Sequence, residues 1–142
     1  MPKPTDPAVL AWTRLVRAHT AAMGQIQAAL KVADLPPLEW YDVLLELERE
    51  APLRPRDLQA KLLLAQYNLS RLLDRMAGAG LVERARCEGD GRGQMVSITG
   101  SGQALRRRMW PVYAEAIEKA VGAKLNTKDA ATLAELLGRL IA

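Results

Sequence analysis

Hydrophobic residues recur at intervals of three and four along most of the chain, which is the spacing of amphipathic helices. One such run predicts a helix near residues 66–79 whose apolar stripe packs on a core. The opposite face of this helix is polar and basic. The stripe consists of Leu69, Leu72, Leu73 and Met76, and the polar face carries Tyr67, Asn68, Ser70, Arg71, Asp74 and Arg75.

The next segment has a different period. Gly78 and Gly80 end the predicted helix, and residues 81–87 and 95–99 then alternate around the glycine-rich sequence 88–93. Alternation with a period of two around such a turn predicts a β-hairpin. A helix with a polar, basic outer face followed by a basic hairpin indicates a winged helix-turn-helix.

Helical patterns also flank this segment. Asp6, as N-cap before Pro7, starts a helix that runs to about Val32. Pro36 and Pro37 precede a second helix from about Leu38 to Glu50, and a short third helix covers 57–63. The first stripe contains Trp12, Leu15, Val16, His19, Met23, Ile26 and Leu30. The second helix directs Trp40, Val43, Leu44 and Leu47 inward and its acidic residues outward.

Two further helices follow the hairpin. Thr99 ends the second strand and caps a helix from about Gly100 to Lys124, which Pro111 is expected to kink because its ring removes one backbone hydrogen bond. Residues 126–129 resemble a capping box and start a last, leucine-rich helix. The apolar surface of the flanking helices exceeds what one small domain covers, which suggests a symmetric dimer.

Composition agrees with a mainly α fold in a single domain of 142 residues. The chain has no Phe, and leucine and alanine favour helices. One Cys and one His support neither a disulfide framework nor an ordinary zinc site. The sequence shows no signal peptide and no apolar run of transmembrane length, so we expect a cytoplasmic protein.

Charge is distributed unevenly along the chain. Residues 54–92 contain eight basic and five acidic side chains, whereas residues 38–51 contain one basic and five acidic side chains. This layout would present the helix and hairpin to a polyanion such as DNA.

In order and spacing, several segments of the chain resemble the MarR family of transcriptional regulators. The resemblance covers nearly all of the chain. The segments that carry it are residues 38–47, 57–58, 70–76 and 80–84, and most strongly Asp90-Gly91-Arg92-Gly93 with Val96-Ser97-Ile98-Thr99-Gly100-Ser101-Gly102.

The resemblance implies a winged helix-turn-helix at about 38–99 and dimerisation helices at about 7–32 and 100–142. It implies a homodimer that binds a pseudo-palindromic operator and releases it when a small ligand or an oxidant acts. Two features depart from the family. Residues 65–68 replace a more usual Ser-x-Ser type sequence, and Gly91 stands where a second arginine is frequent.

Side chains that read bases need hydrogen-bonding groups at the start of the recognition helix. Arg92 lies between two glycines, so its guanidinium could enter a minor groove, with Asp90 orienting it or capping the turn. Arg84 and Arg86 lie on the first strand of the hairpin, and one of them could instead form a structural ion pair within the wing. The candidate DNA contacts are Arg54, Arg56, Gln66, Tyr67, Asn68, Ser70, Arg71, Arg75, Arg84, Arg86, Asp90 and Arg92.

An aromatic, partly polar pocket could hold a flat aromatic acid, although the same residues could simply be packing. Its candidate residues are Trp12, Arg17, His19, Trp40, Trp110 and Tyr113. Cys87 is interpreted as a plain strand residue rather than an oxidation sensor.

No nucleophile–base pair, phosphate-binding loop or cluster of metal ligands is present in the sequence, so an enzyme is not expected and neither a cofactor nor a metal is implied. The function predicted is that of a DNA-binding repressor released by an aromatic or phenolic ligand. The alternatives are a winged-helix module that binds an acidic protein and a constitutive DNA binder without an effector.

Overall fold

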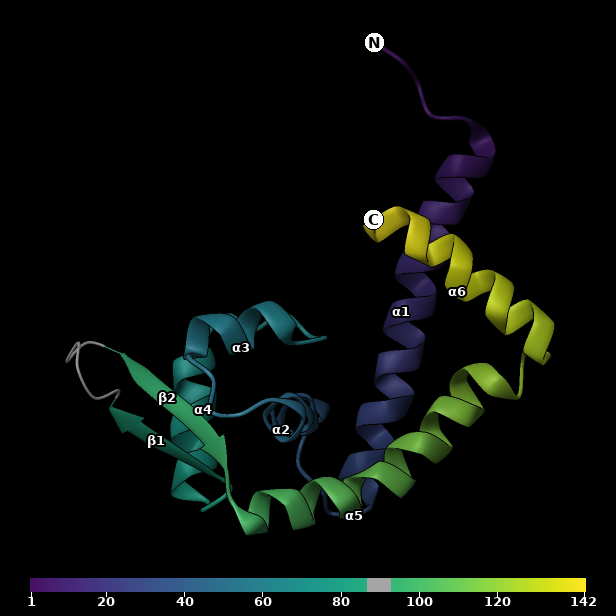
Figure 1. Ribbon diagram of the computed structural model, residues 1–142. Coiled ribbons are helices and arrows are strands. Elements are labelled where there is room, and N and C mark those ends of the chain that lie inside the picture. Colours follow the sequence, from purple (N-terminus) through teal and green to yellow (C-terminus); the bar gives the residue numbers. More distant parts are fainter. Residues whose placement is uncertain (87–92) are drawn as a thin grey trace. The chain divides into compact units, whose positions relative to one another are not determined.

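The computed structural model describes residues 1–86 and 93–142. The chain is mainly helical with a two-stranded wing, as the sequence predicts (Figure 1). It divides into two compact units: residues 34–111 form one, and residues 1–33 with 112–142 form the other. Residues 100–111, assigned from the sequence to the flanking helices, therefore cluster with the winged unit.

The winged unit contains α2 (Leu38–Arg49), α3 (Pro55–Lys61), α4 (Leu69–Gly78), β1 (Val82–Arg86), β2 (Gln94–Ile98) and the start of α5 (Gly100–Ile117). The stripe predicted for α4 is confirmed, because all four of its apolar side chains are buried. Side chains from every helix of the unit and from β2 meet in one core. Its most deeply buried members are Val43, Leu44, Leu47, Leu58, Leu73, Met76, Val96 and Met109.

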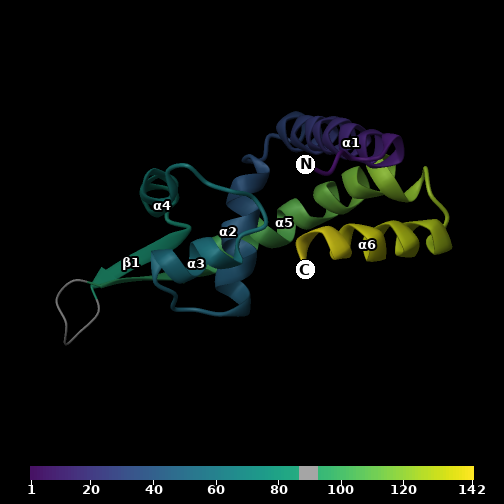
Figure 2. The same ribbon diagram turned by 90° about the horizontal axis from the view of Figure 1, so that it is seen from above.

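The wing is an antiparallel pair whose register runs from Val82 opposite Ile98 to Arg86 opposite Gln94. The backbone of Leu53 also pairs with Val96, through hydrogen bonds of 2.9 and 2.7 Å. Strand β1 contacts α4 and β2 contacts α3, so the base of the wing is held by both helices (Figure 2).

A left-handed residue ends α4. Gly80 has φ +76°, and the N–H of Leu81 donates to the carbonyl of Met76 at 2.9 Å while Gly80 N–H donates to Ala77 at 3.0 Å. This pair of bonds is a Schellman motif, which glycine favours because it has no Cβ. Of the two glycines named from the sequence, Gly80 makes the stop and Gly78 is the last helical residue.

The first turn of α5 is packed directly on the base of the wing. The Thr99 hydroxyl donates to Gly80 O at 2.6 Å and accepts from Gly102 N–H at 3.0 Å, which confirms the predicted cap. A Cβ on Gly102 would lie 2.2 Å from the carbonyl oxygen of Leu81. Only glycine permits this approach, because the obstructing atom belongs to the backbone.

The second unit contains α1 (Asp6–Val32), the end of α5, a π-helical turn η1 (Glu118–Gly122) and α6 (Thr127–Ile141). Thr5, and not Asp6 as expected, caps α1 by accepting from Ala8 N–H. Asn126 caps α6 by accepting from Asp129 N–H, as predicted. Both α1 and α6 pack on η1.

The first half of the predicted α1 stripe is uncovered. Ile26 and Leu30 are buried, whereas Trp12, Val16 and His19 are exposed. Periodicity predicted which face of the helix is apolar, but a single chain covers only its second half. No helix among the described residues is long and apolar enough to cross a membrane.

Candidate nucleic-acid interface

Helix α4 begins later than the sequence suggested. Asn68 has non-helical backbone angles, and its Oδ1 accepts from Arg71 N–H at 3.1 Å, so Asn68 is the N-cap and Leu69 the first helical residue. Asparagine at this position satisfies a backbone donor that has no partner within the helix. Gln66, Tyr67 and Asn68 therefore precede the recognition helix instead of forming its first turn.

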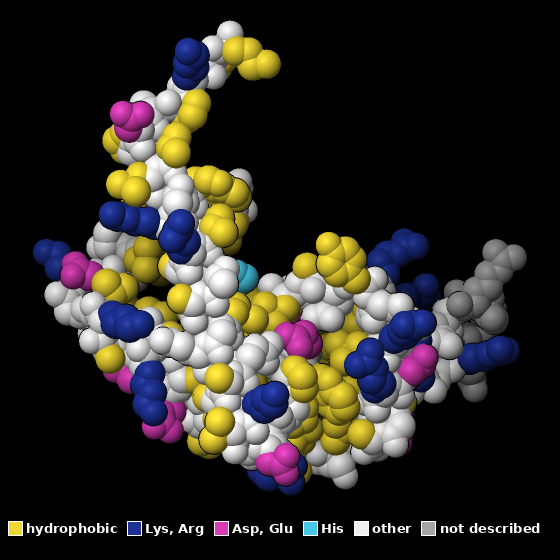
Figure 3. Space-filling model, turned by 180° about the vertical axis from the view of Figure 1, so that it is seen from behind, with side chains coloured by type: hydrophobic (Ala, Val, Ile, Leu, Met, Phe, Trp, Pro, Cys, Tyr) yellow, Lys and Arg dark blue, Asp and Glu magenta, His cyan; other side chains and the backbone are white. Residues whose placement is uncertain are grey.

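The outer face of α4 is exposed as predicted. Ser70, Arg71 and Arg75 point away from the buried stripe, and Tyr67 is fully exposed just before the helix. Gln66 is partly buried, and its carbonyl accepts from Gln59 Nε2 at 3.4 Å. Figure 3 shows Lys and Arg side chains gathered on the part of the molecule that carries the wing.

Arg84 forms the structural ion pair that the sequence left open for one wing arginine. Its Nη1 lies 2.5 Å from Asp74 Oδ1 and 3.3 Å from the carbonyl of Ser70, so the pair joins β1 to α4 instead of lying within the wing. The side chain is only 18% exposed. Arg84 thus neutralises an acid on the face that would meet phosphates, while Arg86 is exposed.

Arg54 and Arg56 lie beside the end of the wing. Together with Asp57, Gly93 and Gln94 they line an open surface pocket of about 600 Å³. The pairing of Leu53 with β2 places them there, and this proximity could not be read from the sequence. Asp90, Arg92 and Cys87 lie outside the described residues.

Asp42 is buried, contrary to the expectation that the acids of α2 face outward. Its two carboxylate oxygens accept from the N–H groups of Leu63 and Leu64, at 3.0 and 2.8 Å. Burial raises the pKa of this carboxyl group above its usual range, and Glu46 and Glu39 add to the effect, although the two hydrogen bonds oppose it. No local sequence signal separates Asp42 from the other acids of α2, because its hydrogen-bond partners lie 21 and 22 residues away.

A second polar cluster joins α2 to α5. Arg106 pairs with Glu48, and Trp110 stacks on Tyr41 with ring centres 6.3 Å apart. Burial lowers the pKa of Arg106, but hydrogen bonds to Tyr41 and Glu48 outweigh it and hold that pKa above its usual value. Tyr41 and Arg106 were not among the residues predicted for a ligand site.

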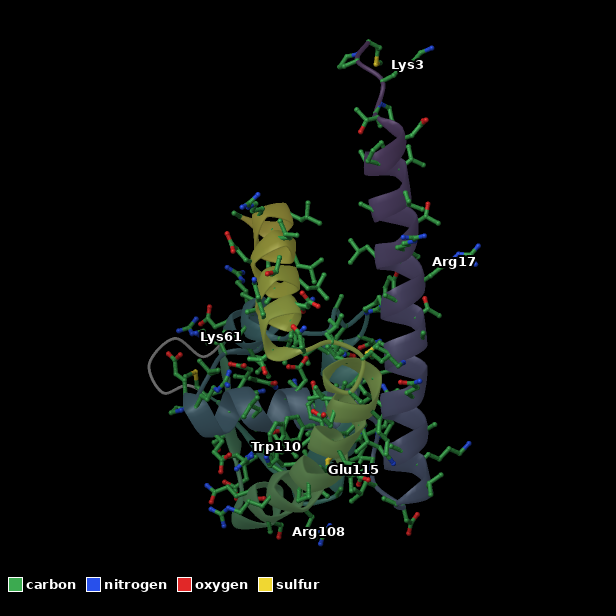
Figure 4. The ribbon with its side chains drawn as sticks, turned by 90° about the vertical axis from the view of Figure 1, so that its right-hand side faces the viewer. Lys3, Arg17, Lys61, Arg108, Trp110 and Glu115 are labelled. Atoms are coloured by element: carbon green, nitrogen blue, oxygen red, sulfur yellow. The ribbon has the colours of Figure 1, made fainter. Side chains whose placement is uncertain are left out.

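The residues predicted for the ligand pocket fall in both units. Trp40 and Trp110 belong to the winged unit, and the other four belong to the second unit. Trp12, Arg17 and His19 are exposed along α1, and Figure 4 shows the Arg17 side chain pointing away from the helix. In the part of the chain that the structure describes, no three His, Cys, Asp or Glu residues are grouped to hold a metal ion.

Parts of the sequence match known transcriptional regulators. Residues 33–93 match the model of the MarR family. An uncharacterised HTH-type transcriptional regulator of Bacillus cereus is 28% identical over 131 residues, which are 92% of this chain and 86% of the relative.

Two solved structures share the fold. Sco3205, a MarR family transcriptional regulator from Streptomyces coelicolor in complex with DNA, aligns with a TM-score of 0.87 and 24% identity over 99% of this chain and 89% of that chain. The transcriptional repressor CouR, bound to a 23-mer DNA duplex, aligns with a TM-score of 0.82 and 22% identity over 100% of this chain and 99% of that chain.

The position of Asn68 predicts how its variants behave. Asn68→Ala removes the cap and should lower the free energy of unfolding by about 1 kcal/mol, whereas Asn68→Ser keeps a capping oxygen and most of the stability. Urea denaturation of the two variants measures this difference. Equal midpoints for the alanine and serine variants would show that the cap contributes nothing.

Proposed function

We propose that this chain is a non-enzymatic DNA-binding regulator of the MarR type, whose family model matches residues 33–93, and that it acts as a homodimeric repressor released from its operator by a small aromatic ligand. The observation that carries the proposal is the exposed polar face of α4, which begins at a capped N-terminus beside the wing. A major groove admits an α-helix, and this face offers hydroxyl and guanidinium donors that could bond to the edges of the bases there.

In this proposal α4 of each protomer enters a major groove, and the wing follows the adjacent minor groove, where the sequence predicts a contact by Arg92. Two half-sites then lie about one helical turn apart. Arg71 and Arg75 contact bases or phosphates from the exposed face of α4. Arg54 and Arg56 meet the backbone from the start of α3, and Arg86 from the wing.

Selection of bound fragments from genomic DNA at low and moderate salt tests the DNA-binding role. We expect enrichment of one short inverted repeat, with Arg71→Ala weakening its binding and reducing the salt slope by about one. Arg108→Ala is the matched control, because Arg108 is an equally exposed arginine on α5 (Figure 4). Recovery of no preferred sequence would favour a module that binds an acidic protein.

The dimer is supported by apolar side chains that a single chain leaves uncovered. On α1 these include Trp12, which is 66% exposed, and on α6 Leu140, which is 68% exposed. Figure 3 shows hydrophobic side chains along the first helix. The large exposed apolar residues on the two helices are Val9, Leu10, Trp12, Val16, Val32, Leu133, Leu136, Leu140 and Ile141.

A charge placed on this surface should separate the protomers. Leu136→Asp introduces a carboxylate on the leucine stripe of α6, where a second chain would have to bury it unpaired. Ala131→Asp adds the same charge on the opposite side of the helix and should leave the dimer intact. Analytical ultracentrifugation compares the two variants, and a dimeric Leu136→Asp protein would place the interface elsewhere.

Release by an aromatic ligand is supported by the stacked pair of Tyr41 and Trp110. The Trp110 residue is 47% exposed, so a flat aromatic acid could extend the stack beside Arg106. The repressor role is supported by CouR, which is described as a repressor bound to DNA.

A thermal-shift screen with aromatic carboxylic acids and phenols tests the ligand. We expect at least one compound to raise the melting temperature of the wild type, and to raise it less in Trp110→Ala, because binding to the folded state stabilises it. A screen in which no compound changes the melting temperature would favour a constitutive DNA binder.

A further inference from the structure

One carboxylate holds the connection between α3 and α4. Asp42 lies in the middle of α2 and is only 5% exposed. Each of its oxygens accepts one backbone N–H, from Leu63 and from Leu64, and these residues are 21 and 22 positions away in sequence. The contact is therefore tertiary and bidentate.

The connection needs such a partner. The N–H of Leu62 still donates to Leu58 of α3, but residues 63–68 form neither helix nor strand, so their N–H groups have no ladder of hydrogen bonds to join. The Asp42 residue is itself almost fully buried. Burying a carboxylate is unfavourable unless hydrogen bonds compensate, and the two N–H groups supply that compensation.

Two further contacts hold the same stretch of chain. Lys61, the last residue of α3, pairs with Glu50 at the end of α2 at 2.9 Å. Gln59 on α3 donates to the carbonyl of Gln66. Asp42 acts between these points, just after α3 ends. The contact at Gln66 and the N-cap Asn68 follow along the chain.

We propose that Asp42 is a positioning residue for DNA recognition, whose buried carboxylate fixes the α3–α4 connection and thereby the place and direction in which α4 begins. Asp42 itself touches no DNA. The inference deepens the proposed function and rests on its assignment of α4 as the recognition helix. Side chains at the start of that helix, Ser70 and Arg71, inherit their positions from the clamped backbone.

A positioning role has a specific signature. Base contacts depend on the placement of α4 to within a fraction of a hydrogen-bond length, whereas phosphate neutralisation tolerates small displacements. Loosening the clamp should therefore weaken operator binding while leaving nonspecific binding and its salt dependence nearly unchanged. A general loss of stability would not separate these two quantities.

The experiment compares Asp42→Asn and Asp42→Ala with Val43→Ala. The first variant keeps one acceptor, the second keeps none, and the third opens a cavity on the same helix at a residue that is fully buried. All are measured at a temperature where denaturation curves show them folded. Affinities are determined for the operator fragment enriched by the wild type and for an unrelated duplex of the same length.

We expect Asp42→Asn to lose about tenfold in operator affinity and Asp42→Ala to lose more, with less than about twofold change on the unrelated duplex. Val43→Ala should change both affinities little. Equal losses in the Asp42 and Val43 variants, or wild-type specificity in Asp42→Ala, would overturn the inference and leave the proposed function standing.

Hydrogen exchange of the wild-type protein tests the clamp even where a variant does not fold. The amides of Leu63 and Leu64 should be protected relative to that of Tyr67, because only the first two donate to a buried carboxylate. Exchange of all three amides at the same rate would overturn the inference. Failure of the wild type to select any operator would overturn the proposed function itself, and this inference with it.

Discussion

The winged unit depends on one constraint, which is that α4 buries a single apolar stripe and leaves its other face exposed to solvent. The stripe packs into a core shared with α2, α3 and β2, and the exposed face carries the hydroxyl group of Ser70 and the guanidinium groups of Arg71 and Arg75. A helix of ten residues has little stability of its own, so tertiary contacts must hold both of its ends. Asn68 and the Asp42 clamp hold the first end, and the Schellman turn at Gly80 holds the second.

The wing is attached to this helix by side chains and by backbone. Arg84 crosses from β1 to the backbone and carboxylate of α4, and Leu53 adds a bridge on the far edge of β2. An isolated two-stranded hairpin is at best marginally stable in water. These contacts attach the hairpin to the core. Arg84 therefore has a structural role, although its residue type and position suggest a phosphate contact.

Sequence reasoning predicted the features that depend on neighbouring residues. The α4 stripe, the hairpin, the Thr99 cap and the Asn126 cap are all local patterns, and all are confirmed. It missed features that depend on distant partners. The sequence predicts Asp42 to be an exposed acid of α2, because the N–H groups that bind its carboxylate lie 21 and 22 residues away. The start of α4 was predicted too early, because helical periodicity continues through its N-cap.

Helix α5 spans the boundary between the two units. Its first turn cannot move without the wing, because Thr99 bonds both Gly80 and Gly102 and because the backbone of Gly102 lies against the carbonyl of Leu81. Further along, Arg106 and Trp110 attach the same helix to α2. Beyond Pro111 the helix belongs to the unit whose apolar faces are uncovered. One helix therefore carries side chains that hold the base of the wing and continues into the unit that we propose forms the dimer.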